Sequence, residues 1–254
     1  MTGLALREVY FAHAGKVSQK WSLYLDVYER VLAPRREDAL RLVEIGVQNG
    51  GSLEIWAKYF PSATAIVGCD IDERCAALRF EDPRIGVVVG PVNARETARA
   101  LLALANPIDV FVDDGSHRSP DVILGFMNYF PFVRPGGVYL VEDLHCAYRP
   151  EYEGGIHKPN AVAFFRALVD AMQGEYWQEQ AGVAEVLAPF VPAGAAPDAV
   201  KLAGQIASIA FHDSLCVIEK RPADGSGRLG ARLIAGREAV VRPEVLSQGK
   251  RTVL

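Results

Sequence analysis

Short apolar runs alternate with longer amphipathic segments through the middle of the chain. Short apolar runs of this kind indicate buried strands, which we predict at residues 42–47, 65–70, 85–89, 108–114 and 138–142. Apolar side chains at helical spacing fill the gaps, and we predict helices at residues 52–59, 73–80, 95–105 and 120–132. Such alternation is typical of right-handed crossovers in a parallel sheet. The pattern therefore predicts a doubly wound α/β fold.

Further elements are expected on both sides of this region. Residues 20–33 carry apolar side chains at helical spacing and predict a helix that ends at Pro34. Residues 144–160 are rich in helix-breaking residues, aromatic residues and histidine, so we expect an irregular lid there. A helix at residues 161–172 and an alanine-rich insertion at 178–204 follow.

The last predicted strands, residues 206–212 and 215–220, are joined only by Asp213 and Ser214. So short a link requires an antiparallel pair. We therefore predict a Rossmann-like, mostly parallel sheet of seven strands that ends in an antiparallel pair. All of it belongs to one predicted domain, 1–254, whose parts are an N-terminal helical segment (1–38), a core (39–220) with the lid, and a tail (221–254).

Composition and charge narrow the classes of protein. The 254 residues include 27 Lys plus Arg and 31 Asp plus Glu, a formal net charge of −4. Nucleic-acid binding depends on clustered Lys and Arg, and the sequence has no such stripe, so we predict no nucleic-acid partner. The four cysteines form neither a CxxC pair nor a zinc-finger spacing, which favours a reduced, cytoplasmic setting.

Membrane and secretory segments are not expected. The N-terminus reaches Arg7 and Glu8 before any apolar run long enough for a signal peptide. The most apolar later stretch, residues 181–200, is interrupted by proline and acidic residues. We therefore predict no membrane span. The sequence leaves open whether the chain forms a homo-oligomer.

The first predicted strand runs into a glycine-rich turn between Glu44 and Ser52. Glycine lets the backbone approach a ligand and adopt positive φ, so Gly46 and Gly50 predict a ligand across this turn. A dinucleotide fingerprint needs a glycine where Gln48 stands, which favours a ligand without a pyrophosphate. A glycine-rich turn without a ligand is the alternative.

Asp70 ends the second predicted strand, beside this turn. An acid at that position can accept hydrogen bonds from both ribose hydroxyls, or it can cap the helix predicted to begin near Glu73. The order acid, glycine turn, acid favours a ligand with an adenosine half.

Two pairs of acids follow the fourth and fifth predicted strands: Asp113 with Asp114, and Glu142 with Asp143. Because neighbouring parallel strands end at the same edge of a sheet, we expect four crowded carboxylates. Their repulsion favours protonation unless a cation joins them, and oxygen ligands suit a hard divalent ion such as Mg²⁺. Capping of the following helices is the alternative.

His117 follows Asp114 by three residues, within reach of anything bound to such an ion. An imidazole is suited to take a proton from a hydroxyl that a metal has acidified. Alternatively, His117 belongs to the cap of the helix beginning at Pro120. His145 and His157, in the predicted lid, have no role that the sequence settles.

With these residues the sequence resembles the class I S-adenosylmethionine-dependent methyltransferases, and specifically the metal-dependent O-methyltransferases. Catechol-type members share an acid-x-Gly pattern with Ser eight residues after the acid, here Glu44, Gly46 and Ser52. The likeness is stronger to the macrolide-sugar O-methyltransferases of the mycinamicin and tylosin type. These carry Asp-x-x-His and a Glu-Asp doublet at the metal, here Asp114 to His117 and Glu142-Asp143.

The resemblance covers roughly residues 16–220 and implies a role for each of these positions. It implies S-adenosylmethionine as methyl donor and His117 as general base. It implies that Mg²⁺ or Mn²⁺ is held by Asp114, Glu142 and Asp143. It implies that the residues contacting the cofactor are Glu44, Gly46, Gly50, Ser52, Asp70, Asn93 and Asp113.

The expected activity is Mg²⁺-dependent methylation of a hydroxyl on a small-molecule or glycosidic acceptor, such as a sugar of an antibiotic or a bacterial surface glycan. A catechol-type O-methyltransferase is the main alternative. A nicotinamide-dependent oxidoreductase and a non-catalytic S-adenosylmethionine-binding protein are further alternatives.

Overall fold

The computed structural model describes residues 4–179, 182–223, 229, 230, 233 and 235. Contacts divide the chain into two units, Met1–Arg221 and Pro222–Leu254. All the helices and strands described below belong to the first unit. The tail predicted at 221–254 coincides almost entirely with the second unit, most of which lies outside the described residues.

The first unit is built on a seven-stranded sheet with the order β3-β2-β1-β4-β5-β7-β6. Its first five strands are parallel, whereas β7 is antiparallel to both β5 and β6. This topology confirms the predicted fold. The strands are β1 (Arg41–Ile45), β2 (Ala65–Asp70), β3 (Ile85–Val89), β4 (Ile108–Asp113), β5 (Val133–Val141), β6 (Ile206–His212) and β7 (Leu215–Lys220).

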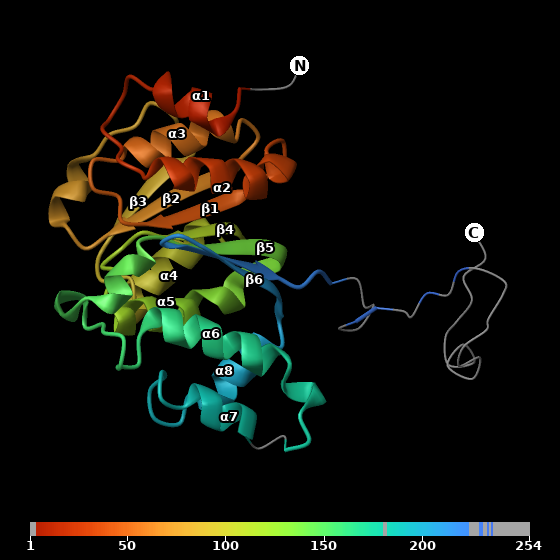
Figure 1. Ribbon diagram of the computed structural model, residues 1–254. Helices are drawn as coiled ribbons and strands as arrows, with labels where there is room; N and C mark the ends of the chain where they lie inside the picture. Colours follow the sequence, from red (N-terminus) through yellow and green to blue (C-terminus); the bar gives the residue numbers. More distant parts are fainter. Residues whose placement is uncertain (1–3, 180–181, 224–228, 231–232, 234, 236–254) are drawn as a thin grey trace. The chain divides into compact units, whose positions relative to one another are not determined.

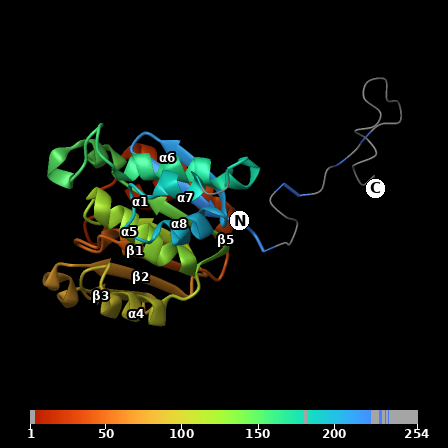
Figure 2. The same cartoon turned by 90° about the horizontal axis from the view of Figure 1, so that it is seen from below.

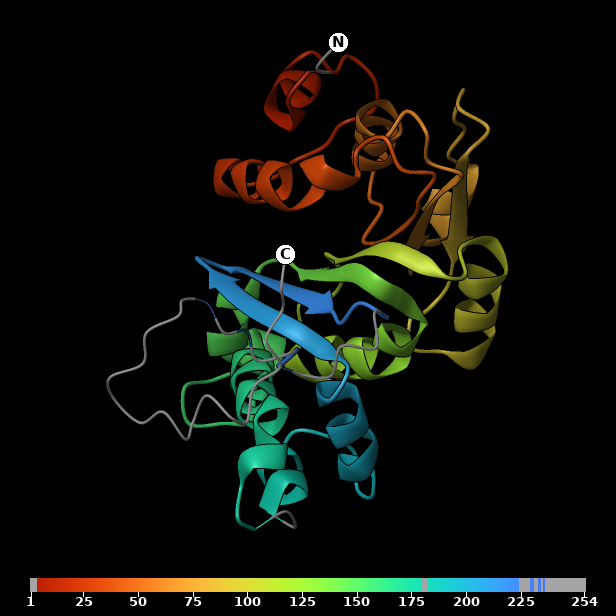
Figure 3. The same cartoon turned by 90° about the vertical axis from the view of Figure 1, so that its right-hand side faces the viewer.

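Helices cover both faces of the sheet (Figures 1 and 3). One face carries α1 (Leu6–Phe11), α2 (Ser22–Leu32) and α3 (Gly51–Tyr59). The opposite face carries α4 (Arg95–Leu104), α5 (Ser119–Tyr129), α6 (Ala161–Met172), α7 (Gly182–Leu187) and α8 (Ala196–Ala203). Seen from below, α4 lies by β2 and β3, and α6 lies at the other end of the sheet (Figure 2).

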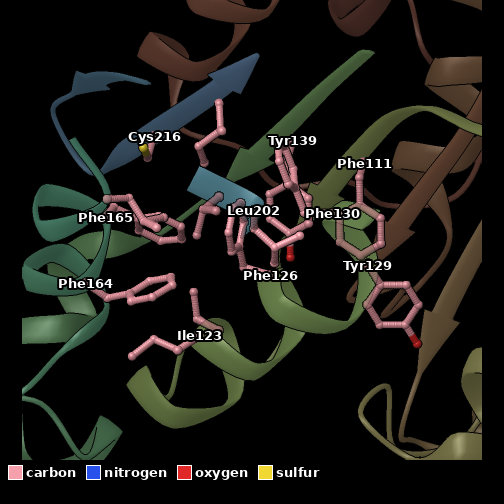
Figure 4. Packing of buried hydrophobic residues seen from close by; sticks show 14 of the residues in the cluster. Phe111, Ile123, Phe126, Tyr129, Phe130, Tyr139, Phe164, Phe165, Leu202 and Cys216 are labelled. Carbon is pink, nitrogen blue, oxygen red and sulfur yellow. The ribbon is translucent and has the colours of Figure 1, made fainter. Parts of the chain in front are cut away.

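Alternation along the strands produces two hydrophobic cores, one on each face. In β4, Val110 and Val112 pack toward α1, α2 and α3, whereas Phe111 packs on the other face. There its ring stacks on Tyr139 with centroids 4.5 Å apart and on Tyr129 at 5.1 Å (Figure 4). Strands buried on both faces explain why the sequence shows continuous apolar runs.

Three predicted elements differ from the observed ones. The helix expected at 73–80 is only a 3₁₀ helix, Glu73–Ala77, after which Leu78 returns to extended backbone. The last parallel strand begins at Val133 instead of 138, because its first half is interrupted by Pro and Gly. The predicted lid contains the 3₁₀ helices Leu144–Tyr148 and Pro150–Tyr152.

Candidate active site

Three neighbouring strands end at one level of the sheet. Ile45, Asp113 and Val141, the last residues of β1, β4 and β5, are register partners. The backbone N–H of Asp114 donates to the carbonyl of Ile45 (3.0 Å), and that of Glu142 donates to the carbonyl of Asp113 (2.9 Å). Asp114 and Glu142 therefore meet at the carboxyl edge of the sheet, where α/β folds bind ligands.

The four acids expected to crowd there do not all do so. Asp113 instead lies in the core beside α5, where its carboxylate accepts a hydrogen bond from the Tyr139 hydroxyl (3.2 Å). That expectation is wrong for Asp113 because consecutive strand residues face opposite sides. Burial raises the pKa of Asp113 to about 7. Its place beside Asp114 and Glu142 is taken by Glu44, which is fully buried.

A lysine that no sequence motif singles out lies among these acids. Lys20 Nζ lies 2.6 Å from Asp114 Oδ2, 2.6 Å from Glu142 Oε1 and 3.2 Å from Glu44 Oε1. The lysine side chain is only 5% exposed. One signal could have revealed it: Lys20, Tyr24 and Tyr28 follow at intervals of four, which places them on one face of a helix or its N-terminal extension.

Burial and charge set the ionisation of this cluster. Burial raises the pKa of Glu142 to about 8 and also raises that of Glu44, while Lys20 acts in the opposite direction on both. Burial alone would lower the pKa of Lys20, but the carboxylates of Glu142, Glu44 and Asp114 together hold it well above its ordinary value. Lys20 is therefore an ammonium that compensates part of the negative charge, and the cluster favours further positive charge.

His117 faces the other side of Asp114. Its Nε2 is 3.9 Å from Asp114 Oδ1 and 3.6 Å from Asp143 Oδ2. One ligand atom from each of these three residues lies within 4.8 Å of the others. Among the described residues, this partly buried group and the group of Glu44, Asp114 and Glu142 around Lys20 are the two that could hold a metal ion, and they share Asp114.

The predicted metal ligands are thus divided about Asp114. Glu142 belongs to the group with Lys20, and Asp143 belongs to the group with His117. The backbone accounts for this division, because Asp143 adopts a left-handed conformation with φ of 53°. Its carboxylate is oriented by hydrogen bonds from the Tyr24 hydroxyl (2.7 Å) and Trp21 Nε1 (3.1 Å).

The glycine-rich turn packs directly against the acidic edge. Gly46 has φ of +91°, and a Cβ there would lie 2.0 Å from the Asp114 carbonyl oxygen. Gly50, with φ of +84°, is the N-cap residue of α3. Ser52, in the first turn of that helix, donates a hydrogen bond to Glu44 Oε2 (2.6 Å). Ser52 therefore orients the Glu44 carboxylate, and the glycines of the turn leave backbone that a ligand can approach closely.

Asp70 shapes this turn from β2. Its Oδ2 accepts hydrogen bonds from the backbone N–H groups of Val47 and Gln48, both at 2.9 Å, and its Oδ1 accepts from Asp72 N–H. The capping role considered for Asp70 falls instead to Asp72, which accepts from the backbone N–H of Arg74. Asn93 follows β3. Its side-chain amide donates to the Asp121 carbonyl and accepts a hydrogen bond from the Asn128 side chain.

Two cavities meet at this edge. One, of about 430 Å³, is lined mainly by polar residues that include Lys20, Trp21, Ser52, His117 and Asp143. The other, of about 380 Å³, has a more apolar wall and is lined by residues that include Asp70, Ile71, Val92, Asn93 and Asp113. Gly46, Gln48 and Asp114 line both cavities. One ligand can therefore extend past the glycine turn from one cavity into the other.

Residues 43–144 match the family described as a methyltransferase domain. The chain contains a methyltransferase domain. The matched residues include Glu44, Asp70, Asp114, His117 and Asp143, so both cavities lie largely within this domain. Lys20 lies outside it.

Curated relatives of this chain are named as O-methyltransferases. The 8-demethyl-8-alpha-L-rhamnosyl tetracenomycin-C 2'-O-methyltransferase of Streptomyces olivaceus is 34% identical over 238 residues, 89% of this chain and 56% of the relative. The demethylmacrocin O-methyltransferase of Streptomyces fradiae is 36% identical over 166 residues, 61% of this chain and 41% of the relative. The chain thus spans about half the length of these relatives.

The chain is also similar to a solved structure, that of the MycE methyltransferase from the mycinamycin biosynthetic pathway in complex with Mg and SAH. The two are 26% identical with a TM-score of 0.67, covering 88% of this chain and 56% of the other. The sheet of this chain, with its antiparallel end, has the class I methyltransferase fold. Among the described residues, no helix is both long and apolar enough to cross a membrane.

Proposed function

We propose that this chain is a metal-dependent O-methyltransferase that transfers the methyl group of S-adenosylmethionine to a sugar hydroxyl. One observation carries the proposal: His117 Nε2 faces the carboxylates of Asp114 and Asp143 where the two cavities meet. A proton acceptor, oxygen ligands for a metal and room for two substrates thus coincide. The names of two relatives, an 8-demethyl-8-alpha-L-rhamnosyl tetracenomycin-C 2'-O-methyltransferase and a mycinamicin VI 2''-O-methyltransferase, favour a glycosidic acceptor.

The methyl donor would extend across the glycine turn. The more apolar cavity suits its adenosine half, with Asp70 at the ribose and with Asn93 and Asp113 farther in. The polar cavity suits its amino-acid end, with Ser52 near the carboxylate and Gly46 and Gly50 allowing close approach. This placement brings the methyl group toward Asp114, which lines both cavities.

The residues at the edge fit a divalent cation. Asp114, Glu142 and Asp143 supply the carboxylate oxygens that Mg²⁺ and Mn²⁺ prefer. Burial raises the pKa of Glu142 to about 8, and added positive charge beside Glu142 would favour its carboxylate form. A divalent ion bound there would lower the pKa of an acceptor hydroxyl and orient it.

Within this site the side chains would position groups and move one proton. His117 Nε2 takes the proton of the acceptor hydroxyl. The hydroxyl oxygen forms a bond to the methyl carbon as the carbon–sulfur bond breaks and its electron pair stays on sulfur. The sulfonium charge disappears in this step, so no nucleophile from the protein is required. The main contribution of the site is orientation of the two substrates.

A sugar acceptor is supported by the rim of the polar cavity. Trp21 is 61% exposed there, and its ring stands edge-on to His145 with centroids 6.5 Å apart. An exposed indole beside hydrogen-bonding groups offers a sugar ring both an apolar face and polar partners.

A substrate screen tests this function. The purified protein is incubated with S-adenosylmethionine and Mg²⁺ against rhamnosylated glycosides, free sugars and catechols, and release of S-adenosylhomocysteine is followed by mass spectrometry. We expect release with glycosides above that with catechols. Release with catechols alone would contradict the acceptor class, and no release with any acceptor would contradict the activity.

A further inference from the structure

Lys20 reaches the acidic cluster from the loop between α1 and α2. This loop is distant in sequence from β4 and β5, which Asp114 and Glu142 follow. Its Nζ lies among carboxylate oxygens of Glu44, Asp114 and Glu142 that come within 4.8 Å of one another. That arrangement is itself one a metal ion could use. A side-chain ammonium therefore takes a cation position within the edge where the metal is expected.

The Lys20 ammonium contacts two carboxylates that are also expected to hold the metal ion. Lys20 contacts Asp114 Oδ2 and Glu142 Oε1, and Glu142 Oε1 also accepts a short hydrogen bond from the Tyr28 hydroxyl. Asp114 keeps Oδ1 for the side that faces His117. A metal ion held by the same Asp114 carboxylate would add a second positive charge beside the ammonium, and the two charges would repel in a buried site.

Lys20 has room to withdraw. It lines the polar cavity of about 430 Å³ together with Ser52 and Gln19. The loop that carries it is held at other points, where Lys16 Nζ bonds Glu54 (2.7 Å) and the Tyr10 hydroxyl bonds the Ser18 carbonyl (3.0 Å). The side chain can therefore turn into the cavity without the loop leaving the domain.

We propose that Lys20 is a tethered competitor of the divalent ion, which neutralises Asp114 and Glu142 in the metal-free protein and withdraws from them when the ion binds. The proposal rests on the metal site of the proposed function. Lys20 would thereby set the metal affinity and keep the buried acids from repelling one another before the metal arrives.

Metal titration tests this role without measuring activity. Free Mn²⁺ is followed by electron paramagnetic resonance in the wild type, Lys20→Met, Lys20→Arg and the control Lys16→Met. We expect Lys20→Met to bind Mn²⁺ about tenfold more tightly or better, because the competing charge is gone, whereas Lys20→Arg and Lys16→Met do not gain affinity. Equal or weaker binding by Lys20→Met would overturn the proposal.

A second measurement uses the unaltered protein, in case Lys20→Met does not fold. Acetylation of each lysine is followed by mass spectrometry in chelator and in saturating Mg²⁺, with Lys16 as internal reference. Faster labelling of Lys20 in Mg²⁺ is expected, and unchanged labelling would contradict withdrawal. If neither the wild type nor Lys20→Met binds Mn²⁺, the metal site of the proposed function fails together with this proposal. If the wild type and Lys20→Met bind Mn²⁺ equally well, the metal site stands and only the proposed role of Lys20 is contradicted.

Discussion

Tyr24 and Asp143 are joined by two hydrogen bonds in opposite directions. The Tyr24 hydroxyl donates to Asp143 Oδ1 (2.7 Å) and accepts from the backbone N–H of Asp143 (3.1 Å). Asp143 is in a left-handed conformation that a non-glycine residue rarely adopts. Helix α2 thus fixes both the backbone and the carboxylate of a residue proposed to hold the metal, although the two residues are 119 positions apart.

Tyr24→Phe should weaken both metal binding and the stability of the fold. Loss of an orienting partner typically reduces metal affinity about 10–100-fold, and an unpaired Asp143 N–H costs about 1–3 kcal/mol of the free energy of unfolding. Mn²⁺ titration and urea unfolding measure the two effects. Tyr148→Phe, at an exposed lid tyrosine, is the control that should change neither. Unaltered Mn²⁺ affinity in Tyr24→Phe would remove its orienting role.

His117→Ala should slow methyl transfer while leaving the affinity for S-adenosylmethionine nearly unchanged. Loss of a general base typically costs about 10²–10⁴-fold in rate, and the proposed cofactor contacts lie elsewhere. The turnover number and calorimetric titration with S-adenosylmethionine separate the two quantities. His157→Ala, an exposed histidine in the predicted lid, serves as the matched control. A wild-type rate in His117→Ala would mean that another group accepts the proton.

Gly46→Ala should destabilise the protein and displace Asp114. The new Cβ would meet the Asp114 carbonyl oxygen at 2.0 Å in addition to the strain of positive φ, and we expect a loss of about 3 kcal/mol in the free energy of unfolding. Gly136→Ala supplies the comparison, because φ there is +76° with nothing within 4 Å. It should cost only about 1 kcal/mol. If urea unfolding gave Gly46→Ala and Gly136→Ala equal losses in the free energy of unfolding, the close contact at position 46 would not add to the cost.

Asp82→Asn should reduce stability at neutral pH and have less effect in acid. Hydrogen bonds from the Arg84 guanidinium hold the pKa of Asp82 below its ordinary value of 3.8, so the folded state favours the carboxylate. This stabilisation is present above pH 3.8 and is lost as the pH falls through the lowered pKa. We expect a difference of up to about 1 kcal/mol at pH 6 that shrinks below about pH 4.

Urea unfolding at several pH values measures this difference, with Glu81→Gln as a neighbouring control. A difference between wild type and Asp82→Asn that stays constant from pH 6 into acid would show that charge on Asp82 does not contribute.

The order of strands and helices could be predicted from the sequence because each buried strand is a short apolar run. The strands at 65–70, 85–89, 206–212 and 215–220 occur at the predicted residues. The helix at 73–80 was overestimated, since its apolar spacing does not reveal that Leu78 returns to extended backbone. Local pattern thus gave the elements more reliably than their lengths.

The set of residues that meet at the candidate site is harder to predict from the sequence. Parallel topology was enough to bring Asp114 and Glu142 to one edge, and the glycine turn was enough to place Gly46 beside it. The role of Lys20 depends on contacts with residues 94 and 122 positions away. The division of Glu142 from Asp143 depends on a left-handed backbone that their sequence does not announce.

The proposed function requires a divalent ion at this edge for methylation of a sugar hydroxyl. S-Adenosylmethionine with a deuterated methyl group and a rhamnosylated glycoside are incubated with the protein in Mg²⁺, in EDTA, and in EDTA followed by excess Mg²⁺. The product is then identified by mass spectrometry and NMR. We expect a deuterated methyl ether on the sugar in the first and third samples and none in the second. Equal transfer in EDTA, or a label found elsewhere than on a sugar oxygen, would contradict it.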